Sequence, residues 1–176
     1  GSYRAFVQEQ DVTLSAQLRA QLAPILDEFC REYGSADSLT PEQAQLCTAR
    51  FLEQLDALRE AGTPLPLDEL VKDTTYQTAT LTVLALRYYG IPARYAEGFV
   101  LTQETAARAQ AGSAITLTAA DAQGWAEVYQ DGTGWMPLAL TPGYGELTDI
   151  LSPHQSESAS QTGDAHTDDG SNAQAE

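Results

Sequence analysis

The segment from Thr75 to Tyr89 predicts a helix that is apolar on nearly all of its sides, and Gly90 marks its end. A helix with a single apolar stripe can lie on a protein surface, whereas a helix without a polar face must be buried. We therefore expect this helix to lie at the centre of the fold, with other elements packed around it. Its apolar positions are Ala79, Leu81, Val83, Leu84, Ala85 and Leu86.

Two helical regions are predicted before the central helix. The first, from about Thr13 to Tyr33, has apolar residues at spacings of three to four, and Pro24 within it is expected to kink the helix or split it in two. The second begins at Thr40, which caps a helix whose first residue is Pro41 and whose third, Gln43, can complete a capping box. This second helix is predicted to extend to about Arg59.

Extended segments follow the central helix. Residues 103–112 between them predict a loop or a short surface helix, and Asp131-Gly132 is a strong signal for a β-hairpin. Helices first and antiparallel strands later indicate an α+β fold, with the N-terminal helices and the buried central helix packed on an antiparallel sheet. The predicted strands are Ile91–Thr102, Ile115–Thr118, Gly124–Gln130 and Gly134–Leu140.

The chain divides into one domain and a polar tail. Gly1-Ser2 is interpreted as a remnant of recombinant expression, and residues 3–152 as a single domain with a helical lead-in over 3–62 and a core over 70–144. Residues 153–176 contain no Ile, Leu, Val or aromatic residue and are predicted to be a disordered acidic linker.

Charge and hydropathy exclude several classes of partner. The net charge is −16, and no basic face that would bind phosphate is visible, so nucleic acid and anionic lipid are not expected to bind. The sequence has no run of about 18 apolar residues and no signal peptide.

Two long motifs carry a family resemblance. LRYYGIPARYAEGFVLT at Leu86–Thr102 and GWAEVYQDGTGWMPLALTPGY at Gly124–Tyr144 resemble the transglutaminase-like superfamily, whose fold is papain-like. The lead-in that starts with YRAFV at Tyr3 looks like that of membrane-anchored bacterial members. The resemblance therefore implies an extracytoplasmic domain at the cell surface, flanked by transmembrane segments in the full-length protein.

The resemblance also places three catalytic positions. Family members use a Cys at the start of the buried helix, a His on one strand and an acid on the next, and here these positions hold Thr75, Gln123 and Ala139. No Cys follows Cys47, and no His precedes His154. Because a thiolate needs a sulfur and a base, no catalytic residue is expected and the chain is predicted to be a non-catalytic relative.

The vacated cleft is expected to persist and to be lined by residues around these positions. Glu127 and Asp121 could form an acid/base pair there, but we favour a hydrogen bond or ion pair of Glu127 with Arg94 or Arg87. The expected cleft-lining residues are Thr75, Tyr76, Gln123, Trp125 and Glu127.

Aromatic residues on the predicted strands allow two interpretations. Trp135 is expected to pack in the core, as strand aromatics generally do. Trp125 could either pack or line a binding groove.

Cys30 and Cys47 each lie on a predicted helix. They could form a disulfide between the first two helices, remain buried as small apolar residues, or provide a reactive thiol. No metal site and no cofactor are expected, since His154 and His166 lie in the polar tail and the acids near them lack the spacing of a calcium-binding loop.

These observations predict a catalytically inactive domain that binds a polypeptide or a peptidoglycan peptide, or that acts as a spacer in a membrane protein. The alternative is an active acyl-transfer enzyme, similar to a cysteine protease or a transglutaminase, that uses residues the motifs do not reveal.

Overall fold

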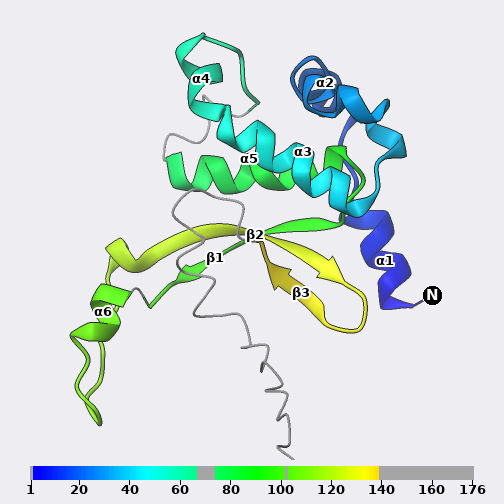
Figure 1. Cartoon of the computed structure of the whole chain (residues 1–176). Coiled ribbons are helices and arrows are strands. Elements are labelled where there is room, and N and C mark those ends of the chain that lie inside the picture. Colours follow the sequence, from blue (N-terminus) through cyan, green and yellow to red (C-terminus); the bar gives the residue numbers. More distant parts are fainter. Residues whose placement is uncertain (1, 67–73, 102, 139–176) are drawn as a thin grey trace, which may run out of the picture.

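The computed structural model describes residues 2–66, 74–101 and 103–138, which form a layer of helices on a small sheet and further helices near its two ends (Figure 1). The helices are α1 (Tyr3–Gln10), α2 (Ala16–Cys30), α3 (Pro41–Glu53), α4 (Leu55–Glu60), α5 (Thr74–Tyr88) and α6 (Gln103–Ala107). Short 3₁₀ turns occupy Arg31–Tyr33, Ala36–Ser38 and Ala119–Asp121. The strands are β1 (Ala93–Phe99), β2 (Ala122–Gln130) and β3 (Gly134–Pro137).

Helix α5 lies between helices α2 and α3 on one side and the sheet on the other, as its apolar surface predicts (Figure 1). On one side it packs on α2 and α3, where Leu81 and Ala85 join a core with Leu26 and Phe51. On its other side a second core is formed with the sheet, by Val83, Leu86, Ala93, Ala126 and Val128. The predicted α+β class with a buried central helix is confirmed.

The sheet has the order β1-β2-β3, and both pairs are antiparallel. Ala93 pairs with Val128 at one end of the β1–β2 ladder and Phe99 pairs with Ala122 at the other. The predicted hairpin is confirmed, because residues 131–133 connect β2 to β3 and Gly132 has a φ of +82°, a conformation that favours glycine.

Polar side chains fix the C-terminal end of α5 to three other segments. The Tyr89 hydroxyl donates to the carbonyl of Leu26 at 2.7 Å, and the Tyr88 hydroxyl donates to Asp27 Oδ1 at 2.5 Å. Arg87 Nε donates to the carbonyl of Ala93 at 2.8 Å, and its guanidinium also contacts Asp11 Oδ1 at 3.3 Å. The helix is thereby joined to α2, to the start of β1 and to the segment after α1.

The capping box of the second predicted helix is confirmed. The Gln43 backbone N–H donates to Thr40 Oγ1 at 3.3 Å, and the Gln43 side chain accepts from the Thr40 N–H at 2.9 Å. The helix nevertheless ends at Glu53 rather than near Arg59, and α4 continues after a break at Gln54. The Gln54 N–H is shared between the carbonyls of Arg50 and Phe51, which tightens the last turn and interrupts the α-helical pattern.

Pro24 does not split the first helical region, which was one of the two predicted outcomes. Helix α2 is 15 residues long and continues without a break through Pro24. Ala20 is exposed, so water can take the place of the missing N–H donor to its carbonyl.

The predicted strand at Ile115–Thr118 is wrong, because this segment pairs with none of the described strands and Ile115 and Leu117 remain exposed.

Several predictions lie outside the described residues. These are the disordered tail over 153–176 and the C-terminal part of the core beyond Leu138, which includes Ala139. Among the residues that the structure does describe, no helix has both the length and the apolar composition to cross a bilayer.

Replacing Leu86 with alanine should destabilise the domain. Leu86 is fully buried between α5 and the sheet, so its removal leaves a cavity and should lower the free energy of unfolding by about 2–5 kcal/mol, measured by urea denaturation. Leu46→Ala on α3 is the matched control, since Leu46 is 43% exposed and should change stability by less than about 0.5 kcal/mol. Equal effects of the two substitutions would contradict the central burial of α5.

Candidate functional site

The first turn of α5 meets the first half of β2 at Gly124. A side chain on Gly124 would place its Cβ atom 2.9 Å from Cδ1 of Tyr76 and 2.7 Å from the hydroxyl of Tyr95. Only glycine fits between these two rings. Because Tyr76 follows Thr75 and Gly124 follows Gln123, two of the three predicted catalytic positions adjoin this contact. The side chain of Thr75 and the whole of Ala139 lie outside what the structure describes.

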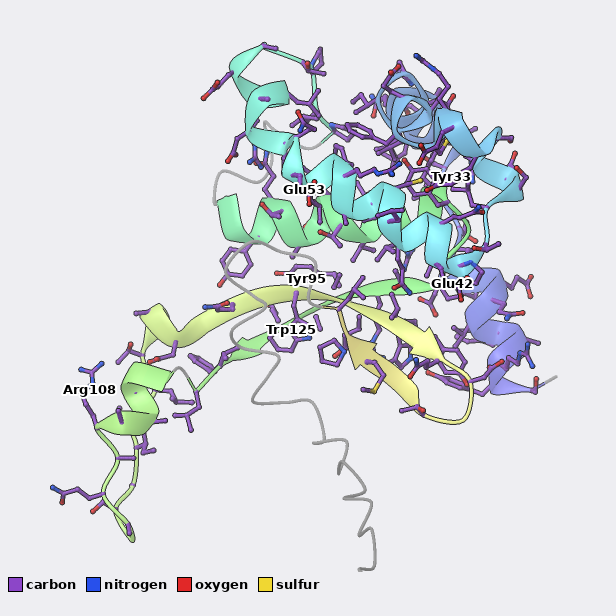
Figure 2. The ribbon with its side chains drawn as sticks, viewed as in Figure 1. Tyr33, Glu42, Glu53, Tyr95, Arg108 and Trp125 are labelled. Carbon is purple, nitrogen blue, oxygen red and sulfur yellow. The ribbon has the colours of Figure 1, made fainter. Side chains whose placement is uncertain are left out.

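The two faces of β2 have different roles. Gly124, Ala126 and Val128 are buried on the face that turns toward α5. Since successive side chains of a strand point to opposite faces, Gln123 and Trp125 lie on the other face. Figure 2 shows Tyr95 on the α5 side of the sheet and Trp125 on the far side. The expected cleft-lining residues are therefore divided, with Tyr76 meeting β2 on the face opposite to that of Gln123, Trp125 and Glu127.

Trp125 is only partly buried and extends its ring across strand β1. It pairs with Ala96 in the ladder, and its Cη2 atom is 3.2 Å from the place where a Cβ atom would stand on Gly98. The absence of a side chain on Gly98 thus makes room for the indole ring. The indole N–H donates to Glu127 Oε1 at 3.2 Å, which holds the ring in this orientation.

Glu127 is fixed by two donors. Its side chain is only 12% exposed, and its Oε2 atom accepts from Arg94 Nε at 2.7 Å, while Trp125 holds Oε1. The Arg94 guanidinium lies 4.4 Å from the centre of the Trp135 ring. The predicted ion pair of Glu127 with Arg94 is confirmed, and both carboxylate oxygens are occupied by groups of the protein.

Among the described residues, the Asp121 carboxylate is held by threonines and not by Glu127, Arg94 or Arg87. It accepts from the backbone N–H and the hydroxyl of Thr118 and from the hydroxyl of Thr105. Arg87, the other partner considered for Glu127, binds Asp11 instead. The two carboxylates therefore sit in separate hydrogen-bond networks, which disfavours an acid/base pair.

A family model of the transglutaminase-like superfamily matches residues 72–140. The chain carries a transglutaminase-like domain. The matched segment includes α5, all three strands and the positions of Thr75, Gln123 and Ala139. Neither the comparison with curated proteins nor that with solved structures gave a significant match. The observed helices and antiparallel sheet agree with the papain-like α+β fold that the resemblance implied.

An aromatic cluster of the transglutaminase-like domain joins the sheet to α1, a helix that was not predicted from the sequence. Trp135 packs edge to face on Tyr129, with ring centres 5.6 Å apart, and its Nε1 donates to the hydroxyl of Tyr3 on α1 at 3.0 Å. Trp135 therefore packs against other aromatic rings, but the expectation that it lies in the core is wrong, because it is only partly buried and belongs to neither core cluster. Helix α1 has one buried residue, Val7, and the spacing of Tyr3, Phe6 and Val7 at i, i+3 and i+4 is the sequence signal by which it could have been found.

Both cysteines lie on the helical side of α5, away from the sheet. They are free thiols with 1% and 0% exposure, in the core shared by α2, α3 and α5. Burial, with the negative charge of Asp27, raises the pKa of the Cys30 thiol, and burial together with Cys30 raises the pKa of Cys47. Raised pKa values keep both groups as thiols rather than nucleophilic thiolates. The disulfide between them stays a prediction.

Among the described residues, no group of three or more His, Cys, Asp or Glu side chains is arranged to hold a metal ion. The site of the transglutaminase-like domain thus has three parts. Gly124 contacts the start of α5, the Trp125 ring forms an indole platform on the opposite face of the sheet, and the Glu127 carboxylate is hydrogen-bonded to Trp125 and Arg94.

Gly124→Ala should destabilise the transglutaminase-like domain. The new methyl group would overlap the rings of Tyr76 and Tyr95, and overpacking of this kind costs about 1–3 kcal/mol in the free energy of unfolding. The double variant Gly124→Ala/Tyr95→Ala should recover part of this loss relative to Tyr95→Ala alone, because one of the two rings is removed. Urea denaturation of the four proteins gives the comparison, and full additivity would argue against the contact.

The two thiols should be unreactive in the folded, reduced protein. With both groups buried and their pKa values raised, a thiol reagent such as 5,5′-dithiobis(2-nitrobenzoate) at pH 8 should label neither in water and both in concentrated urea. Rapid labelling of the native protein would contradict this arrangement. The same count on air-oxidised protein in urea tests the predicted disulfide, which would leave no thiol to label.

Proposed function

We propose that this transglutaminase-like domain is non-catalytic and that it binds a polypeptide or a cell-wall peptide. The observation that carries the proposal is the separation of the only two sulfur nucleophiles from the family's catalytic positions. Cys30 and Cys47 are buried on the helical side of α5, whereas Gln123 lies on the sheet. The family's nucleophile, base and acid positions hold Thr75, Gln123 and Ala139.

The chemistry of these residues supports the loss of catalysis. A threonine hydroxyl has a pKa far above neutrality and attacks a carbonyl only when a base removes its proton. A glutamine amide does not serve as that base. Glu127, the acidic residue of β2 on the same face as Gln123, has both oxygens engaged with Arg94 and Trp125. No described group near Gln123 thus offers an activated nucleophile.

The retained scaffold supports a binding role. The contact of Tyr76 and Tyr95 with Gly124 and the pair of Glu127 with Arg94 hold the elements around the former catalytic positions in place. Trp125 offers a partly exposed indole ring beside Gln123, whose amide both donates and accepts. An aromatic ring and an amide are suited to the apolar side chains and the backbone amides of a peptide.

An extracytoplasmic, membrane-anchored location is part of the same proposal. It rests on the similarity of the lead-in beginning at Tyr3 to membrane-anchored bacterial relatives. The full-length gene supplies the check, because hydrophobic segments of about 20 residues should flank this domain. In such a protein the domain would act as a ligand-binding module held at the cell surface.

Incubation with an amine donor and a glutamine-containing protein, or with peptidoglycan peptides, should give no product above background. Thr75→Ala and Gln123→Ala should behave like the parent protein, because neither residue is expected to take part in turnover. Product formation that Thr75→Ala abolishes would establish the alternative, an active acyl-transfer enzyme. Turnover lost with Cys30→Ala or Cys47→Ala would do the same for an unrecognised thiol mechanism.

A further inference from the structure

A cavity of about 550 Å³ lies in the excursion between β1 and β2, apart from the site described above. Figure 1 shows α6 and the loop after it extending beyond the end of the sheet, on the side away from α1. The cavity wall includes Thr105 and Arg108 from this excursion, Ile115 from the returning segment, and Thr118 and Asp121 immediately before β2. Its volume is in the range of small-molecule sites.

Asp121 is a buried carboxylate in the wall of this cavity. It is 7% exposed, and its Oδ2 atom accepts from the N–H of Thr118 at 2.7 Å and from the hydroxyl of the same residue at 3.0 Å. Its Oδ1 atom accepts from the hydroxyl of Thr105 at 3.1 Å. An ionised carboxylate has about four acceptor positions, so Oδ1 retains the capacity for one further donor.

The same groups keep Asp121 negatively charged. Hydrogen bonds from Thr118, first from its backbone and then from its side chain, hold the pKa of Asp121 below its usual value, and the positive charge of Arg108 lowers it further. Arg108 is exposed and also lines the cavity. A fixed negative group and a positive group therefore line one small space whose remaining wall is formed by hydroxyl groups, alanines, Gln110 and Ile115.

We propose that this cavity binds a small zwitterion of the α-amino acid class. The ammonium group donates to Asp121 Oδ1, the carboxylate accepts from the Arg108 guanidinium, and the side chain lies toward Ile115. A small anion would be opposed by the net charge of the chain, which is −16, and a simple cation would be opposed by Arg108. A ligand that carries both charges is attracted by both groups. This site is separate from the proposed peptide site.

Titration of the full chain with glycine, L-alanine and D-alanine, followed by calorimetry and by amide chemical shifts, tests the proposal. At least one of these amino acids should bind, with shifts concentrated in residues 105–121. N-acetylalanine lacks the ammonium charge and alanine amide lacks the carboxylate, and each should bind at least tenfold more weakly than alanine. Absence of binding by all three amino acids at millimolar concentration would overturn the proposal, as would equal binding of alanine and either capped form.

Variants separate the site from general charge effects. Arg108→Gln should weaken binding at least tenfold, whereas Arg31→Gln, which removes another exposed arginine far along the chain, should leave it unchanged. Equal binding by these two variants would also overturn the proposal. Asp121→Asn should abolish binding, and since it also alters the turn at Thr118, its folding is checked by urea denaturation. Arg108→Gln gives the decisive result where Asp121→Asn does not fold.

Discussion

The burial of α5 on two opposite sides is the constraint on which the rest of the structure depends. A helix without a polar face is not stable at the surface of a domain. Helices α2 and α3 therefore cover one side of α5, and strands β1 and β2 cover the other. Burial alone would leave such a helix free to slide or rotate, because apolar contacts are non-directional. The directional contacts come from Arg87, Tyr88 and Tyr89 at its last turn. Together they set where β1 begins, and the register of β1 with β2 then positions Gly124 against the first turn of α5.

The sequence predicted those parts of the fold whose residues act on their near neighbours. The capping box at Thr40 and the hairpin at Asp131-Gly132 are local patterns, and both are present. The helix α1 was missed because it contributes a single buried residue and is held by long-range contacts such as that of Tyr3 with Trp135. The segment Ile115–Thr118 has strand-like alternation but no partner strand among the described residues, and pairing is a property of the whole sheet rather than of the segment.

The candidate site was predictable in part for the same reason. The pairing of Glu127 with Arg94 follows from two strands in antiparallel register, which the motifs on either side imply. What the sequence did not reveal is that the alternation of β2 separates Tyr76 from Gln123, Trp125 and Glu127 across the two faces of the sheet. Proximity to a motif in the sequence does not show on which face of the sheet a residue lies. The contact of Tyr76 with Gly124 shows that Tyr76 lies on the α5 face. The hydrogen bonds of Asp121 with both Thr105 and Thr118 could likewise not be predicted from the sequence, because they depend on the chain between these two threonines turning back on itself.

The distribution of charge explains why neither site suits an anionic partner. Ion pairs join arginines of the described residues to carboxylates of the same chain, and most of these pairs are exposed and contribute little to stability. These pairs instead neutralise much of the positive charge, so the excess of acidic residues gives the chain a negative electrostatic field. Arg108 lines the cavity beside Asp121. A neutral peptide on the indole platform and a zwitterion in the cavity are both ligands that such a field does not repel, whereas phosphates and polyanions would have to approach against it.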